Sequence, residues 1–159
     1  MDKQLKKILE DLKIEYQLFE HPPVHTVEEA EPYWSNIEAT HCKNLFLRNG
    51  KGSKHYLIVT EHSKKLSIKK LEEILNEKLS FASPERLKKY LNLEPGSVSP
   101  FGLINDISKN VKLLVDSDLQ QAEKLGFHPN TNMATLVITL SAFQKFINWS
   151  ANEFIFCKL

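Results

Sequence analysis

The chain has 159 residues, with 21 lysines and arginines against 20 aspartates and glutamates. This length fits one domain, residues 1–159, and the net charge of +1 excludes a protein that coats nucleic acid through bulk electrostatics. The two cysteines, Cys42 and Cys157, lie in no metal or redox spacing, and no apolar run is long enough to cross a membrane, so we expect a cytoplasmic protein without membrane contact.

The N-terminal part of the chain predicts a helix, a strand and a loop. A helix is expected over residues 3–13 because four apolar residues recur at helical spacing: Leu5, Ile8, Leu9 and Leu12. A short strand over residues 16–19 follows. His21-Pro22-Pro23 then forms a rigid loop, because prolines remove backbone donors and restrict the residue before them.

A short helix and a β-hairpin are predicted next. The segment 26–34 opens with Thr26 and, three positions later, Glu29, which is the pattern of a capping box at a helix start. Two apolar, β-favouring runs, residues 43–47 and 55–60, are separated by a turn that contains two glycines. This arrangement indicates a hairpin.

Two capped helices flank a short strand in the middle of the chain. Ser67 caps a helix with a predicted inward face of Ile68, Leu71, Ile74 and Leu75. A strand is expected over residues 80–82. Ser83-Pro84 opens the next helix, since proline is favoured in a first helical turn, and its inward face is Leu87, Tyr90 and Leu91.

The C-terminal part predicts strands over residues 111–115 and 133–139, a short helix over residues 118–125, and a last helix opened by Ser141. Helices and strands are interleaved, but hairpins are present. This combination favours an α+β fold with a mixed, largely antiparallel sheet over a doubly wound parallel sheet.

Four motifs occur in order along the chain. They are His21-Pro22-Pro23 running to Thr26-Val27-Glu28-Glu29, Lys43-Asn44-Leu45-Phe46-Leu47, Gly96-Ser97-Val98-Ser99-Pro100-Phe101-Gly102-Leu103-Ile104-Asn105, and Phe127-His128-Pro129-Asn130-Thr131-Asn132. Together they resemble the YbaK/prolyl-tRNA synthetase-associated editing domain family, most closely its free-standing Ala-tRNA(Pro) deacylases, the PrdX-type prolyl-tRNA editing proteins. The resemblance extends from the first helix to about Phe146. It implies a curved, barrel-like mixed sheet wrapped by helices.

Lys43 is the first candidate catalytic residue. On local sequence alone, a lysine at the start of an apolar strand is usually a solvated charge at the strand edge. The resemblance implies instead that Lys43 is the residue most closely tied to activity. An ammonium group can hold a carbonyl or phosphate oxygen and stabilise developing negative charge in a site shielded from water.

The loop from Gly96 to Pro100 is the second candidate catalytic element. Glycine allows the backbone to approach a ligand and proline fixes the exit, so the N–H groups of Ser97, Val98 and Ser99 could face an ester carbonyl as an oxyanion site. The alternative is an ordinary turn after a helix, which Pro95-Gly96 alone would favour. The resemblance implies the catalytic interpretation.

The remaining candidates are polar groups around the substrate. The resemblance implies that substrate is bound by His21, Pro22, Thr26, Asn44, Pro100, His128 and Asn132. A histidine before proline is more often a structural hydrogen-bonding group than a proton carrier, so we expect Asn132 to position substrate and His128 to orient water or bind the substrate amine. Thr26 is expected both to cap its helix and to form a pocket wall.

Several other chemistries are excluded by spacing. His21 and His25 have the spacing of a helical metal pair, but two prolines lie between them and no third ligand follows. Cys42 has no oriented base beside it for a thiol nucleophile. The chain also lacks a G-x-S-x-G elbow, a Walker loop and a dinucleotide fingerprint. We therefore expect hydrolysis without a metal, a cofactor or a covalent intermediate.

The resemblance implies a trans-editing enzyme. A synthetase pocket built for proline cannot strongly exclude alanine, since a missing methylene is worth only about 1–3 kcal/mol, so a second and smaller site must hydrolyse Ala-tRNA(Pro). Two alternatives remain open at this point: a deacylase for Cys-tRNA(Pro), and a non-catalytic module that binds aminoacyl-tRNA or a synthetase.

The expected partners are the acceptor end of tRNA(Pro) carrying a small amino acid and, as a further candidate, prolyl-tRNA synthetase. Local positive surface is available in three clusters: Lys64-Lys65 with Lys69-Lys70, Lys88-Lys89, and Arg48 with Lys51 and Lys54. Each cluster alone is more often a solvated face than a binding site. With a near-neutral chain, we expect few phosphate contacts and a shallow salt dependence of binding.

Overall fold

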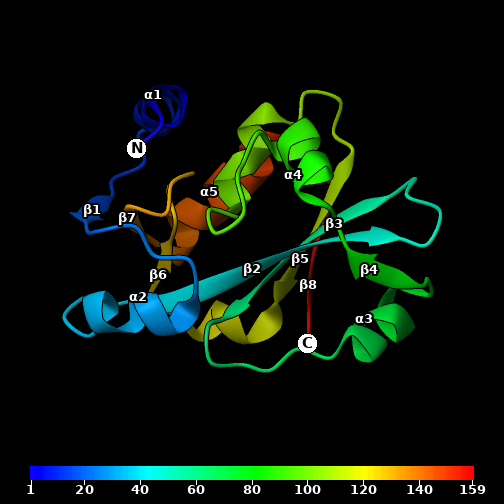
Figure 1. Cartoon of the computed structure of the whole chain (residues 1–159). Helices are drawn as coiled ribbons and strands as arrows, with labels where there is room; N and C mark the ends of the chain where they lie inside the picture. The colour runs from blue at the N-terminus through cyan, green and yellow to red at the C-terminus, as the bar shows by residue number, and fades with distance from the viewer.

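In the computed structural model, which describes all 159 residues, the longest strand, β2 (Thr40–Asn49), joins the two halves of the sheet. Its 10 residues extend roughly 33 Å, which allows different partners along its length. It pairs antiparallel with β3 (His55–Glu61) and, near its C-terminal end, with β4 (Leu79–Phe81). At its N-terminal end it pairs parallel with β6 (Lys124–Phe127). Figure 1 shows β2 crossing the molecule between these partners.

The sheet is mixed and open. Its strand order is β1-β7-β6-β2-β3-β5-β8, and the strands not yet introduced are β1 (Gln17–Glu20), β5 (Val111–Asp116), β7 (Ala134–Thr139) and β8 (Phe154–Cys157). Four pairings are antiparallel and three are parallel. Because β1 and β8 stand at the two edges, the sheet does not close into a barrel. The predicted α+β fold with a mixed sheet is confirmed.

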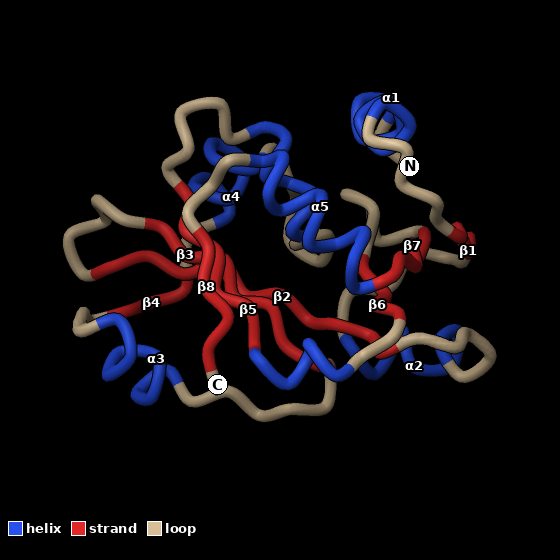
Figure 2. Tube along the Cα trace, turned by 180° about the vertical axis from the view of Figure 1, so that it is seen from behind, coloured by secondary structure: helices blue, strands red, loops and turns tan.

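Helices cover both faces of this sheet (Figures 1 and 2). On one side lie α1 (Lys3–Asp11), α4 (Pro84–Leu91) and α5 (Leu140–Ser150), and on the other α2 (Val27–Trp34) and α3 (Ile68–Leu75). Two 3₁₀ helices, η1 (Pro100–Asn105) and η2 (Ser117–Gln121), complete the elements. No helix combines the length and the apolar character that a membrane span requires.

The core is divided by the sheet. Leu57 and Val59 of β3 belong to the main hydrophobic cluster, which also contains Leu91 of α4. The alternate residues Tyr56 and Ile58 belong to a second cluster under α3. Successive side chains of a strand point to opposite faces. A strand that is covered on both faces therefore has a continuous run of apolar residues in its sequence.

Three of the four helix starts predicted from capping residues are confirmed. Thr26, Ser67 and Ser83 each accept a hydrogen bond from a backbone N–H of their own first turn. Glu29 completes the capping box differently, since its Oε2 accepts from the N–H of His25, at 2.7 Å. The expectation that Ser141 opens the last helix is wrong by two residues, because the Thr139 side chain caps α5 by accepting from Ala142 N.

The prediction of a helix over residues 118–125 is also wrong. Those residues contain the short η2 followed by β6. A Cβ atom at Gly126 would lie 2.6 Å from Nδ1 of His41, so only glycine allows β2 and β6 to approach here. β6 has four residues, one of them glycine, and so carries too little apolar alternation to be recognised in the sequence. β8 is equally short, and the sequence did not predict it either. Ile74, expected to face inward, is 40% exposed.

His55 is a buried titratable residue at the start of β3. Its side chain is 2% exposed, its ring stacks on Phe46 and lies 4.0 Å from the Tyr90 ring, and its Nε2 accepts a hydrogen bond from Arg86 Nη1. Burial, followed by the positive charges of Arg86, Lys89 and Arg48, lowers the pKa of His55 to about 4. The folded protein therefore holds His55 in its neutral form.

We expect the protein to lose stability as the pH falls from about 6.5 toward 4. The unfolded chain takes up a proton on His55 in this range while the folded chain does not, so His55 contributes most above pH 6.5 and up to roughly 3 kcal/mol is lost on acidification. Urea unfolding of the wild type and His55→Gln at pH 7.5, 6 and 5 measures this, because glutamine keeps an acceptor for Arg86 without titrating. The variant should show the smaller pH dependence. Equal slopes would contradict the assignment.

Candidate active site

A small cavity of about 190 Å³ lies between β2, α2 and the loop before η1. Its lining comes from all three elements and from the segment after β6, and consists of His25, Thr26, Val27, Ala30, Trp34, Cys42, Lys43, Asn44, Gly96, Val98 and His128. Residues from the four sequence motifs thus meet at one place. Six of the predicted site residues line the cavity: Thr26, Lys43, Asn44, Gly96, Val98 and His128.

Lys43 reaches the cavity from β2, where it stands opposite Thr60 of β3. It takes part in none of the ion pairs of the structure. The positive charge of Lys43 acts on Glu28. The pKa of Glu28 is lowered by hydrogen bonds from the Glu28 N–H and from Thr26, and the charge of Lys43 lowers it further. The ammonium of Lys43 is therefore available to a ligand.

Asn44 fixes the loop against the strand. Its Nδ2 donates a hydrogen bond to the carbonyl of Val98, at 3.1 Å. Its Oδ1 is buried and has no partner. A buried acceptor without a donor costs free energy, so this oxygen is suited to accept a hydrogen bond from a bound ligand.

Gly96 has a backbone conformation that favours glycine. Its φ is +87°, and a Cβ atom there would lie 3.4 Å from Nδ1 of His25 and 3.9 Å from Nδ2 of Asn132. The loop then turns tightly, because Ser97 N donates to Glu94 O at 3.0 Å. The close approach of Gly96 to the His25 segment forms one end of the cavity.

The three loop N–H groups predicted as an oxyanion site are not equivalent. The N–H of Ser97 is already bonded to Glu94, and Ser99 is fully buried with its hydroxyl accepting from Phe101 N. Only Val98 lines the cavity, and its N–H forms no hydrogen bond within the protein. Of the three predicted N–H groups, only that of Val98 is placed to donate a hydrogen bond to a ligand in the cavity.

His128 lines the cavity with one ring nitrogen engaged. Its Nδ1 lies 3.3 Å from the carbonyl oxygen of Ala134, and because a carbonyl can only accept, Nδ1 carries the proton. Burial lowers the pKa of His128, which favours the neutral ring. The other nitrogen, Nε2, then has a lone pair that can accept a hydrogen bond from water or from an amine.

The α2 wall of the cavity is held from behind by a chain of hydrogen bonds. Trp34 Nε1 donates to Thr135 Oγ1 at 3.1 Å, and Thr135 Oγ1 lies 3.1 Å from His21 Nε2. Nδ1 of His21 donates to the carbonyl of Pro22. The hydroxyl of Thr135 must therefore donate to His21, so that one tautomer satisfies the whole chain.

Four of the predicted substrate-binding residues do not line the cavity. His21 is buried, stacks on Tyr33 and belongs to the hydrogen-bond chain behind α2. Pro22 is exposed, and Pro100 is buried at the start of η1. Asn132 stands beside Gly96, and its carbonyl accepts from Val24 N. These residues shape or support the site from outside the cavity.

Sequence reasoning missed part of the lining. Val27, Ala30 and Trp34 are one face of the predicted helix, and their i, i+3, i+7 spacing is visible in the sequence. That spacing shows a shared face, but it does not show that the face borders a cavity. His25 also lines the cavity, but the sequence analysis considered it only as a metal ligand. Burial raises the pKa of Cys42 well above its usual range, so its thiol stays protonated, as expected of a wall residue.

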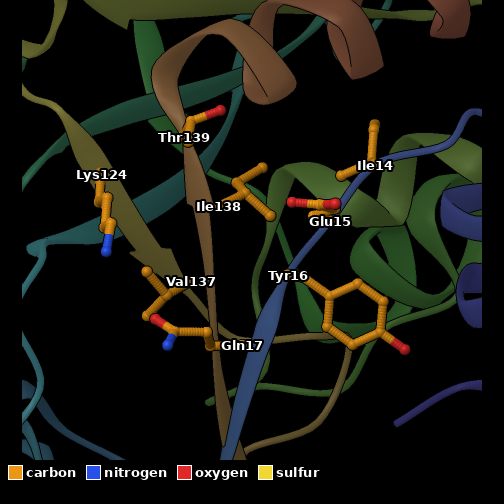
Figure 3. Close-up of a pocket in the computed structure, with 8 residues that line it drawn as sticks. All are labelled: Ile14, Glu15, Tyr16, Gln17, Lys124, Val137, Ile138 and Thr139. Atoms are coloured by element: carbon orange, nitrogen blue, oxygen red, sulfur yellow. The ribbon is translucent and has the colours of Figure 1, made fainter.

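A larger depression of about 610 Å³ lies elsewhere, along β1, β6 and β7. Figure 3 shows its lining, in which the amine of Lys124 and the hydroxyl of Tyr16 point away from each other. It contains none of the predicted site residues, and its polar ends do not converge. No group of three or more His, Cys, Asp and Glu side chains in the structure is arranged to hold a metal ion.

A family model described as the aminoacyl-tRNA editing domain matches residues 21–146. The chain belongs to the aminoacyl-tRNA editing domain family. This membership confirms the resemblance found in the sequence motifs. The matched residues include every residue that lines the cavity of this editing domain.

Relatives of the editing domain support the same assignment. The chain is 43% identical to the prolyl-tRNA editing protein ProX of Acetoanaerobium sticklandii over 92% of this chain and 90% of that protein. It is 32% identical to prolyl-tRNA synthetase associated domain-containing protein 1 of Bos taurus, over 94% and 90% of the two chains.

Two solved structures share the fold of the editing domain. Hypothetical protein APE2540 has a TM-score of 0.75 at 18% identity, with 96% of this chain and 97% of that chain covered. A proposed trans-editing enzyme for prolyl tRNA synthetase has a TM-score of 0.72 at 17% identity, covering 100% and 99%. At these identities the likeness concerns the fold alone.

Proposed function

We propose that the protein is a trans-editing deacylase that hydrolyses mischarged Ala-tRNA(Pro). The observation that carries the proposal is the small cavity lined both by Lys43, whose ammonium forms no ion pair, and by the Gly96 loop. Its volume of about 190 Å³ corresponds to roughly six water molecules at about 30 Å³ each. It is below the roughly 300–1,000 Å³ of pockets for drug-sized ligands. The cavity therefore suits a small aminoacyl group, with the nucleoside end outside.

The polar groups of the cavity have complementary roles in this reaction. Asn44 Oδ1 and His128 Nε2 are acceptors for the substrate ammonium, while Lys43 Nζ and the N–H of Val98 are donors for the ester carbonyl. Water attacks the carbonyl, the negative charge grows on its oxygen, and the donors stabilise it. The ester bond to the ribose breaks and the proton passes to the leaving ribose oxygen, which gives alanine and free tRNA.

The lining of the cavity contains no Asp or Glu side chain, so no carboxylate of the lining acts as the base that activates water. The neighbouring ribose hydroxyl of the substrate supplies this function in our proposal, with His128 Nε2 as a hydrogen-bond acceptor that orients water or the amine. Selection by size is assigned in our proposal to the wall formed by Val27, Ala30 and Trp34, which bounds the space for the amino-acid side chain.

The finer features of the proposal are the partner and the compartment. The acceptor end of tRNA(Pro) is the substrate, and the name of the Bos taurus relative supports an association with prolyl-tRNA synthetase. The thiols of Cys42 and Cys157 are both free, which fits the reducing cytoplasm in which tRNA is charged.

Side-by-side deacylation of Ala-tRNA(Pro), Cys-tRNA(Pro) and Pro-tRNA(Pro) tests the proposal. We expect rapid loss of the alanyl ester and no acceleration for the prolyl ester. Preference for the cysteinyl ester would reassign the substrate within the same reaction. If none of the three esters is hydrolysed faster than in buffer, the proposed function is rejected.

A further inference from the structure

Trp34 is the largest side chain that lines the cavity, and its indole is fixed on several sides. Its Nε1 donates to Thr135 Oγ1. The indole stacks on the ring of His41, with ring centroids 4.6 Å apart and ring planes at 6°. The ring of His62 meets it edge-on at 5.2 Å. Because Trp34 lines the cavity and His41 does not, His41 supports this wall from outside the cavity.

His41 fills a space on the sheet that is open because residue 126 is glycine. Gly126 of β6 pairs with His41 of β2 on one side and with Val137 of β7 on the other. Side chains of directly opposed residues lie on the same face of a sheet, and Val137 belongs to the same hydrophobic cluster as Trp34. A Cβ atom at Gly126 would lie 2.6 Å from Nδ1 and 3.1 Å from Cε1 of His41. The His41 ring therefore takes the place of a side chain at 126.

A hydrogen bond to the chain after α2 sets the orientation of this ring. His41 Nε2 lies 3.2 Å from the carbonyl oxygen of Ile37, and because a carbonyl can only accept, Nε2 carries the proton. Ile37 N donates in turn to the carbonyl of Trp34, at 2.9 Å. His41 is thus connected to Trp34 twice, through the stacked rings and through the backbone turn after α2.

Packing alone does not account for a histidine at this position. His41 is 6% exposed, and its Nδ1 is buried without a hydrogen-bond partner. Burial lowers the pKa of His41, against the opposing effect of the bond to Ile37, so the ring is neutral. A buried acceptor without a donor costs free energy that an aliphatic side chain would avoid. What the histidine adds is a flat ring of fixed orientation against the indole.

We propose that His41 is a positioning residue for substrate selection: seated against Gly126, its ring holds Trp34 in place as the wall that limits the amino-acid side chain. This inference rests on the proposed deacylase function and adds to it the residues that set the position of the wall. His41 touches no substrate in this scheme. Without its ring, the indole can withdraw into the space left behind it, and the cavity becomes larger.

The test compares two esters of tRNA(Pro), alanyl and 2-aminobutyryl, which differ by one methylene. In His41→Ala, we expect the ratio of kcat/KM for the alanyl ester to kcat/KM for the larger ester to fall at least about fivefold, since one methylene in an apolar pocket is worth about 10–200-fold. The kcat for the alanyl ester should change less than about threefold, because Lys43 and Val98 stay in place. His41→Phe keeps a stacked ring and should retain most of the wild-type ratio. A phenylalanine variant as unselective as His41→Ala would overturn the proposal.

Gly126→Ala tests the same contact from the sheet side. The added methyl group displaces the His41 ring, on which Trp34 is stacked, so KM for the alanyl ester should rise. Adding His41→Ala to Gly126→Ala removes the crowding, and the double variant should recover a lower KM. Residues in contact give such non-additive effects. Effects of the two substitutions that simply add would overturn the proposal.

Tryptophan fluorescence follows the indole without any substrate. The chain has two tryptophans, so Trp149→Phe leaves Trp34 as the only one. In this background, Gly126→Ala should shift the Trp34 emission maximum although no aromatic ring is removed, and an unchanged emission would overturn the proposal. If the wild type hydrolyses neither ester, the deacylase function is rejected, and the emission series still decides whether His41 positions Trp34.

His55→Ala is the matched control. It also removes a buried histidine that packs on aromatic rings, but His55 lies outside the cavity lining. We expect it to lower the free energy of unfolding and to leave the ester ratio unchanged. An equal fall of the ratio in His55→Ala, or equal losses on both esters in His41→Ala, would overturn the proposal in favour of a general loosening of the fold.

Discussion

Lys43→Ala is expected to lower kcat/KM for Ala-tRNA(Pro) by at least about 100-fold, the loss typical of removing one donor to an oxyanion. Lys43 lines the cavity and has no ion-pair partner, so its charge is free to act on the substrate. In a cavity sheltered from water, an ammonium near a developing alkoxide is worth far more than in bulk solvent. The measurement is the initial rate of deacylation over a range of substrate concentrations.

The control for this experiment is a lysine of similar chemistry outside the cavity. Lys65 is exposed and forms no ion pair, so Lys65→Ala should deacylate at nearly the wild-type rate. Neither substitution should move the free energy of unfolding by more than about 0.5 kcal/mol, because neither side chain is buried or bonded. A fully active Lys43→Ala, or a Lys65→Ala with the same loss, would reject the assigned role of Lys43.

The sequence predicted those elements whose stability is local. The capped helices α2, α3 and α4 could be read because Thr26, Ser67 and Ser83 act within their own first turns. The hairpin of β2 and β3 was visible because its strands are apolar and joined by a short turn. These signals need no knowledge of what lies across the sheet.

The elements that were missed depend on distant partners. β6 is stabilised by pairing with β7 and with the start of β2. Gly126 has no side chain, which leaves space for the His41 ring. β8 adds a parallel edge to β5 through four residues. A short strand of this kind carries no period of its own, so its sequence cannot distinguish it from a loop.

The same limit applies to the site, because a sequence motif identifies residues but does not show which of them border the cavity. The motifs identified Lys43, Gly96 and His128, and the fold brings all three to one cavity. They did not separate residues that line the cavity from residues that support it. His21 is the clearest case: its part in a motif suggested substrate contact, whereas its ring accepts a hydrogen bond from Thr135 of β7, which in turn accepts one from Trp34 in the cavity wall.

Gly96→Ala is expected to produce the second large loss. The positive φ of Gly96 costs about 1–3 kcal/mol for a residue with a Cβ atom, so the loop will shift to relieve it. A shift of the loop displaces Val98, which is tied to Asn44 and carries the free N–H at the cavity. A displacement of about 1 Å at such a donor costs roughly 100-fold in rate. Deacylation and thermal unfolding should be measured together.

Two further variants separate backbone strain from crowding at this position. Gly96→Asn should retain more activity than Gly96→Ala, because asparagine adopts positive φ more readily. Adding His25→Ala to Gly96→Ala should restore nothing, since the added Cβ has room beside the His25 ring and the cost lies in φ. Gly50→Ala serves as the control, because its Cβ would meet only Lys78 at 3.7 Å and its φ is not positive. Rescue by His25→Ala would show instead that the loop is limited by contact with the α2 segment, and the oxyanion role of Val98 would then lose its main support.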